Sequence, residues 1–173
     1  NKGFQGWGSK DEPGDEKLLA YLWKNQHSTP FEFAGATFEV QAPIMVFREW
    51  HRHRTQSYNE MSARYTPMPD LNYIPTLERV TNNAGGRNKQ AGTAHGADAL
   101  TDEAAEAWRA RLAAHYEEGQ RLYADGLQAG IPKELARLVI PVGRYSRMRA
   151  SANLRNWLGF LRLRLDEHAP WEI

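Results

Sequence analysis

The sequence predicts an α+β fold in which a mixed or antiparallel β-sheet is flanked by helices. Apolar residues recur at helical spacing over 101–127, and β-forming residues gather over 31–41 and 144–151. The length of 173 residues suits one domain with a buried core. We therefore expect a single domain over 1–173, with both of its ends incomplete because the chain starts and stops abruptly.

The first half of the chain is expected to supply two helices and a strand before a less regular segment. Residues 1–15 have the composition of a loop, and the apolar spacing after them predicts a short helix that ends near Asn25. Partial alternation of β-forming residues predicts a strand over 31–41. An apolar stripe that begins with a proline predicts a helix over 43–52, and 57–65 is expected to be extended.

In the second half, strands are expected to alternate with helices. Thr101 is a suitable N-cap for a long helix, because two acidic residues follow it. Leucines at helical spacing predict a last helix. The expected elements are, in order, a strand over 71–75, a mobile surface loop over 81–96, a helix over 101–127, one or two helical turns over 133–138, a strand over 144–151 and a helix over 153–165.

The composition excludes several classes of protein. With 41% hydrophobic and 25% charged residues, the chain has the composition of a folded globular protein. A net charge of +1 gives no general attraction for nucleic acid or membranes, so we expect neither as a partner. The sequence contains no apolar run that could span a bilayer and starts without a signal-peptide pattern, which predicts a cytoplasmic protein. The absence of cysteine excludes disulfides and a cysteine nucleophile.

The segment 52–65 carries the densest set of chemical groups. It combines guanidinium forks, hydroxyls and a carboxylate, which together can hold phosphates and a hydrogen-bonding base. If the segment is extended, Glu60, Ser62 and Arg64 share one face. The alternative is a solvated basic turn, but the neighbouring apolar helix and two tyrosines place these charges near buried surface.

A second basic cluster follows in the last third of the chain. It contains few acids and comprises Arg137, Arg144, Arg147, Arg149, Arg155, Arg162 and Arg164. For Arg144, Arg147, Arg149 and Arg162, a solvated helix face is an equally good interpretation.

The segment 52–65 resembles the signature of the flavin-dependent thymidylate synthases, R-H-R-x-x-S-x-N-E-x-S-x-R-Y, and matches it at every fixed position. The similarity extends to 27–32 and 153–173, and it is weakest over 76–129. This resemblance implies the fold of that family and the reductive methylation of deoxyuridine monophosphate (dUMP) to dTMP. The carbon would come from 5,10-methylenetetrahydrofolate, FAD would be the redox cofactor, and NADPH the reductant. The absence of cysteine agrees with this, because the folate-only enzyme uses a cysteine nucleophile.

The resemblance also implies roles for individual residues and a homotetramer whose sites are shared between subunits. The FAD-binding residues would be Thr29, Arg52, His53, Arg54, Thr55, Glu60, Asn153, Leu154, Arg155 and Gly159, with His27, Glu32 and His168 near them. The dUMP-binding residues would be Glu49, Trp50, His51, Arg52, Glu60, Met61, Ser62, Ala63, Arg64, Arg137 and Arg164.

Arg164 is the residue that the resemblance assigns to catalysis. A guanidinium beside the uracil edge stabilises negative charge on the ring and raises electron density at the carbon that is methylated. No protein nucleophile is then needed, and no Ser-His-acid pattern suggests a covalent role for Ser62.

The sequence departs from the family pattern at three positions. Glu49 stands where glutamine is frequent, and a carboxylate beside a phosphate costs energy unless an arginine neutralises it. Gly159 stands where a polar flavin contact is usual, and Pro170 replaces a common glutamine.

Two other hypotheses remain open at this point. One is a nucleic-acid-binding module that uses the arginines on phosphates and Tyr58 and Tyr65 on bases. The other is an inactive relative that keeps the fold. A metal site is not expected, because His51 and His53 lack the spacing and the carboxylate neighbours of ligands. A Rossmann-type FAD site is not expected either, because no G-x-G-x-x-G follows a strand.

Overall fold

The computed structural model describes residues 15–81, 100–166 and 172–173. Most of the loops expected over 1–15 and 81–96 lie outside these residues, and their described ends, Asp15 and Thr81, belong to helices. None of the described helices combines the length and the apolar composition needed to cross a bilayer.

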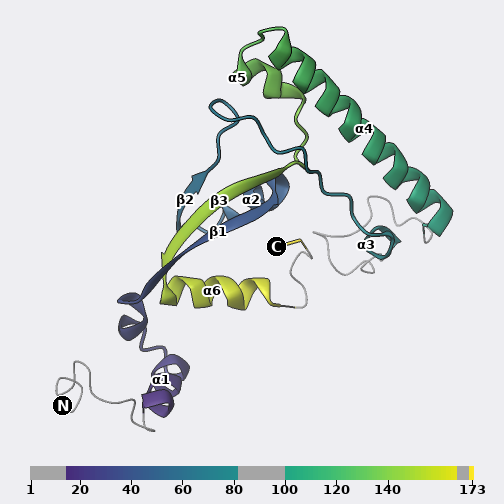
Figure 1. The fold of residues 1–173 in the computed structure, drawn as a ribbon. Helices are drawn as coiled ribbons and strands as arrows, with labels where there is room; N and C mark the ends of the chain where they lie inside the picture. The colour runs from purple at the N-terminus through teal and green to yellow at the C-terminus, as the bar shows by residue number, and fades with distance from the viewer. Residues whose placement is uncertain (1–14, 82–99, 167–171) are drawn as a thin grey trace.

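A three-stranded antiparallel sheet forms the centre of the molecule (Figure 1). It consists of β1 (Gly35–Pro43), β2 (Ser57–Glu60) and β3 (Tyr145–Asn153). The order is β1-β3-β2, so the middle strand is the last of the three in the sequence. The expected α+β class with an antiparallel sheet is confirmed.

The core lies on one face of this sheet, under α2 (Ile44–Trp50) and α6 (Leu154–Arg164). Side chains alternate across a strand, so Met148 and Ala150 of β3 point into the core while Arg147 and Arg149 are exposed. The buried residues that form the core cluster are Phe47, Met148, Ala150, Trp157 and Phe160.

The two longest helices after β2 each begin with a side-chain N-cap, which is Asn153 for one and Thr101 for the other. The Asn153 side chain accepts a hydrogen bond from the backbone N–H of Asn156 at the start of α6. Thr101 accepts one from the N–H of Ala104 at the start of α4 (Asp102–Gln128). Both predicted helices are confirmed, and the predicted N-cap Thr101 of α4 is confirmed as well.

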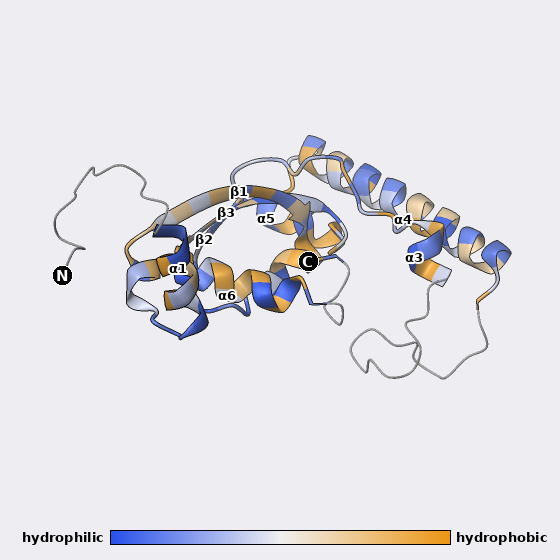
Figure 2. Cartoon of the chain, turned by 90° about the horizontal axis from the view of Figure 1, so that it is seen from below, coloured by the Kyte–Doolittle hydropathy of each residue, from blue (hydrophilic) through white to orange (hydrophobic). Residues whose placement is uncertain are grey.

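The helix α4 lies to one side of the sheet, as a long diagonal rod in Figure 1. It packs on α3 (Leu77–Thr81), α5 (Lys133–Ala136) and the 3-10 turn η3 (Arg137–Val139). Figure 2 shows hydrophilic and hydrophobic segments mixed along its length. It buries Ala105, Tyr116 and Tyr123 and leaves other apolar residues exposed.

The helix α1 (Asp15–Lys24) lies apart from the sheet in Figure 1 and has no buried residue. It is followed by the short 3-10 turn η2 (Thr29–Glu32). The Trp23 and Phe31 rings pack in a T-shaped arrangement, with ring centroids 5.3 Å apart. This contact joins α1 to the segment that enters the sheet.

Several expected boundaries need correction. The strand expected over 31–41 starts later, because 29–32 forms η2, and it continues to Pro43. The strand expected over 71–75 is wrong: it is reduced to an isolated bridge between Asn72 and Arg144. Among the described residues, its pairing consists of two backbone bonds, Tyr145 N–H to Leu71 O and Tyr73 N–H to Gly143 O.

The extended conformation expected over 57–65 is confirmed only as far as Glu60. After the N–H of Met61 bonds to Arg147 O, the chain turns, and the N–H groups of Tyr65 and Thr66 both bond to Ser62 O. A shared strand face for Glu60, Ser62 and Arg64 is therefore wrong. The helix α3 was not expected from the sequence.

Candidate active site

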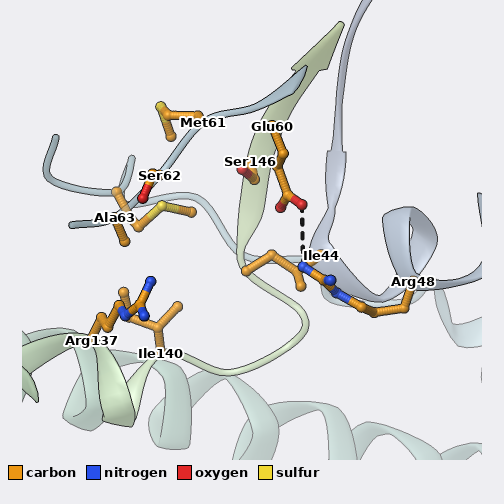
Figure 3. A pocket seen from close by; sticks show the side chains of 10 residues that line it. Ile44, Arg48, Glu60, Met61, Ser62, Ala63, Arg137, Ile140 and Ser146 are labelled. Atoms are coloured by element: carbon orange, nitrogen blue, oxygen red, sulfur yellow. Dashed lines mark hydrogen bonds and ion pairs between the residues drawn. The ribbon is translucent and has the colours of Figure 1, made fainter. Parts of the chain in front are cut away.

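A cavity of about 340 Å³ lies where the motif segment meets α2, η3 and the start of β3 (Figure 3). Its lining residues are Ile44, Arg48, Glu60, Met61, Ser62, Ala63, Met68, Arg137, Ile140 and Ser146. Two segments that carry predicted substrate residues, 60–63 and Arg137, thus meet in one cavity.

Opposite walls of the cavity carry different charges. On one wall, Nη2 of Arg48 lies 3.2 Å from Oε2 of Glu60 and forms an ion pair with it. Figure 3 shows Arg137 across the cavity from this pair. Its Nε donates a 3.4 Å hydrogen bond to Glu134 O, and no acidic side chain of the described residues forms an ion pair with it. Arg137 therefore remains available to an anionic ligand.

The turn after β2 places the motif residues at the cavity. The strand pairing ends at Met61, and the turn closed on Ser62 O then directs 61–63 along the wall. Arg64 leaves this wall, and its guanidinium lies 5.2 Å from the centre of the exposed Tyr65 ring.

The motif residue His53 contacts the C-terminal end of α6. The Nε of Arg164 donates a 3.0 Å hydrogen bond to Nε2 of His53. The His53 and Phe160 rings form a T-shaped contact, with ring centroids 4.8 Å apart. Burial, and then the positive charge of Arg164, lowers the pKa of His53 below its usual 6.5. His53 is therefore neutral at pH 7, and its Nε2 is a hydrogen-bond acceptor.

A third group gathers at the N-terminus of α6. The Nδ2 of Asn156 donates a 3.0 Å hydrogen bond to Thr55 O, which ties the motif to the helix. Arg155 pairs with Glu32 of η2, the turn that begins at Thr29. A Cβ added at Gly159 would meet nothing within 4 Å, so this side of α6 is open in the single chain.

The remaining predicted residues lie near these groups without lining the cavity. Trp50 stacks on Phe160 and donates a 2.8 Å hydrogen bond to Gln56, and His51 lies 3.0 Å from the sulfur of Met148. Both rings pack in or beside the core. The residues Glu49, Arg52, Arg54, Arg64 and Leu154 are exposed.

Within the described chain, the structure does not bring all the key arginines together. Arg137 lines the cavity, whereas Arg52, Arg64 and Arg164 are not among its lining residues. The roles predicted for these residues stay predictions.

Five lining residues were missed from the sequence: Ile44, Arg48, Met68, Ile140 and Ser146. A signal existed for two of them. Ile44 and Arg48 are four residues apart in a helix, so they share one face of it. No signal marked Ser146, because the sequence does not show which face of β3 borders a cavity.

Comparisons with known proteins place the chain among thymidylate synthases. The family model described as thymidylate synthase complementing protein matches residues 4–173. The flavin-dependent thymidylate synthase of Thermotoga neapolitana is 38% identical over 164 residues, which are 95% of this chain and 68% of the relative. That of Thermosipho africanus is 38% identical over 168 residues, 97% of this chain and 71% of the relative.

A solved structure shares the fold. The UMP/dUMP methylase PolB from Streptomyces cacaoi, bound with 5-Br UMP, superposes with a TM-score of 0.75 at 33% identity. The match covers 90% of this chain and 67% of that one.

Proposed function

The chain belongs to the thymidylate synthase complementing protein family, and from this premise we propose that it catalyses the reductive methylation of dUMP to dTMP. The carbon donor is 5,10-methylenetetrahydrofolate. In the reaction, C5 of the uracil gains the carbon and loses its proton, and NADPH provides the two electrons that reduce the methylene to a methyl group.

The cavity that joins 60–63 to Arg137 is the observation that carries this proposal. Its unpaired guanidinium suits the nucleotide phosphate, and the Ser62 hydroxyl and the Glu60 carboxylate suit its other polar groups. The volume of about 340 Å³ lies in the range of small-molecule sites.

A flavin is the cofactor named for the relatives, and we propose FAD. The N-terminus of α6 gathers donors that fit a pyrophosphate: the helix N–H groups, the Arg155 guanidinium and the nearby Thr29 and Thr55 hydroxyls. Bound FAD would supply the reducing equivalents that it takes from NADPH. The exposed Arg52 and Arg54 would add positive charge, and the open side of α6 at Gly159 would leave room for the ring.

Arg164 is proposed as the catalytic residue. Its guanidinium would stabilise negative charge on the uracil ring. Because Arg164 contacts His53 and does not line the cavity of its own chain, a neighbouring subunit would supply it. A neighbouring subunit would likewise supply the other predicted nucleotide contacts that lie outside the cavity, namely Glu49, Trp50, His51, Arg52 and Arg64.

A homotetramer with shared sites is therefore part of the proposal. Large apolar side chains that are uncovered in the single chain support it, among them Leu18, Tyr21, Phe33, Trp108, Leu122, Leu138 and Val142. Their exposed fractions range from 48% at Trp108 to 88% at Phe33, which is unusual for so many large apolar residues on one domain. A cytoplasmic location and the absence of nucleic-acid and membrane partners stay predictions.

The experiment that tests the proposal combines a spectrum with a turnover assay. We expect the purified protein to show flavin absorption after incubation with FAD, and the spectrum to change when dUMP is added. Tritium release from C5-labelled dUMP should require both the folate and NADPH. An Arg137→Ala variant should bind dUMP at least tenfold more weakly, as expected for a lost charge-assisted bond.

The matched control is Arg121→Ala, which removes an exposed arginine of α4 that is paired with Glu118. It should leave dUMP binding unchanged. A protein that takes up no flavin and binds oligonucleotides with a steep salt dependence would instead be a nucleic-acid-binding module.

A further inference from the structure

Ser146 is a polar residue in the cavity wall that no role described above uses. It has no exposed surface, and its hydroxyl finds no hydrogen-bond partner among the described residues. A buried hydroxyl without a partner destabilises the protein relative to an alanine at the same position. Its place in the cavity wall suggests that the missing partner is a ligand.

The Ser146 hydroxyl can reach the cavity at little cost. It turns about a single side-chain bond, and no hydrogen bond has to break when it does so. The backbone of β3 stays in place, since it is paired with Ala42 of β1 at this position.

The sheet register fixes which end of the cavity Ser146 belongs to. Glu60 pairs with Met148, and Ser146 is the next residue on the same face of β3. Figure 3 shows Ser146 beside Glu60, on the wall opposite Arg137. Ser146 and Glu60 therefore act on the same part of a ligand.

The charges indicate which part of a nucleotide lies there. The unpaired Arg137 attracts a phosphate to its end of the cavity, whereas at the other end the Arg48 guanidinium is already paired with Glu60. An ionised carboxylate only accepts hydrogen bonds, so it suits a sugar hydroxyl that donates one. Arg48 pairs with Oε2 of Glu60, and Oε1 has no side-chain partner among the described residues, so it can accept this bond.

We propose that Ser146 is a sugar-positioning residue. Its hydroxyl donates to the 3′-oxygen of the deoxyribose, while the 3′-hydroxyl donates to Glu60. This inference rests on the proposed binding of dUMP in the cavity. It adds Ser146 to the site and identifies the deoxyribose as the part of the substrate that Ser146 contacts.

The test is the binding of two nucleotides to the full oligomer, measured by calorimetry. With Ser146→Ala, the Kd for dUMP should rise roughly three- to tenfold, the effect of one neutral hydrogen bond. The Kd for 2′,3′-dideoxyuridine monophosphate, which lacks the 3′-hydroxyl, should not change. Ser146→Thr keeps a hydroxyl and should bind dUMP within about twofold of the wild type.

Thermal unfolding without nucleotide separates this role from a structural one. Ser146→Ala should melt at the same temperature as the wild type or higher, because it removes an unpartnered buried hydroxyl. The matched control is Ser151→Ala on the opposite face of β3, which loses a 2.9 Å hydrogen bond with Thr37. It should leave both nucleotide affinities unchanged.

Three results would overturn the inference. An unchanged dUMP affinity in Ser146→Ala would remove Ser146 from the site, and an equal loss for both nucleotides would place its partner elsewhere on the ligand. A lower melting temperature with unchanged binding would make the role structural. A wild type that binds neither nucleotide would refute the proposed function itself, which is a distinct outcome.

Discussion

The hydrogen bond between Arg164 and His53 links two residues that are far apart in the sequence. It requires an unprotonated Nε2 on His53, because a guanidinium only donates. Protonation of His53 would break the bond and place a second positive charge beside Arg164. Burial of the ring, and then the positive charge of Arg164, lower the pKa of His53 in the folded protein.

The lowered pKa predicts how stability depends on pH. The folded state holds the proton on His53 less tightly than the unfolded state, whose pKa stays near the usual 6.5. The contribution of His53 to the free energy of unfolding is therefore complete above about pH 6.5, and it is lost as the pH falls below this value. We expect melting curves recorded from about pH 8 to pH 5 to show a smaller decline in His53→Gln. An identical decline in both proteins would contradict this.

Arg164→Ala should separate flavin binding from catalysis. Loss of a preorganised donor at the developing charge is expected to lower turnover roughly 100-fold or more. The protein should still retain FAD, which its absorption spectrum would report. The control Arg162→Ala changes an exposed arginine of the same helix turn and should keep most of the activity. An unchanged rate in Arg164→Ala would exclude the proposed catalytic role.

At the level of elements, α6 joins the core to the candidate sites. Its first turn lies beside Thr55 and Glu32, its middle buries Trp157 and Phe160, and its last turn carries Arg164. The aromatic contacts of Phe160 with Trp50 and His53 connect the core to the motif. Displacing this helix would therefore disturb all three regions.

Truncation of the buried face of α6 should destabilise the protein much more than truncation of its exposed face. Phe160 is 8% exposed, and Phe160→Ala should cost about 3–5 kcal/mol in the free energy of unfolding. The adjacent Leu161 is 42% exposed, and Leu161→Ala should cost less than about 1 kcal/mol. Chemical denaturation measures both. Equal losses would mean that an interface between subunits covers Leu161.

At the scale of the whole molecule, a single chain separates the arginines that the proposed reaction needs. Arg137 lines the cavity, and Arg164 points to His53. The proposed tetramer resolves this separation by supplying Arg164 to the cavity of another chain.

Mixed oligomers test this arrangement. Assayed alone at limiting dUMP, Arg137→Ala and Arg164→Ala should each have little activity, whereas co-expressed chains should recover roughly a quarter of the active sites if subunits mix at random. The recovered sites would take Arg137 from one chain and Arg164 from another. Mixed oligomers that remain inactive would show that both arginines must come from the same chain.

Local patterns in the sequence were sufficient for most elements. Thr101 and Asn153 start helices because their side chains cap the backbone N–H groups, an interaction within three residues. The alternating burial of β3 is likewise local. By contrast, a strand over 71–75 depends on a partner, and among the described residues it finds only two backbone bonds, one to Gly143 and one from Tyr145 at the start of β3.

The sequence by itself determined the family, through the motif over 52–65, and it predicted the residues that would carry its chemistry. Only the tertiary structure decided which of them share a cavity, because the turn at Ser62 and the register of β3 result from pairing between distant segments. It brought Arg48 and Ser146 into the wall and left Arg64 outside. Short-range patterns specify residue types and helix ends, whereas the position of a side chain in a cavity depends on contacts that no local pattern encodes.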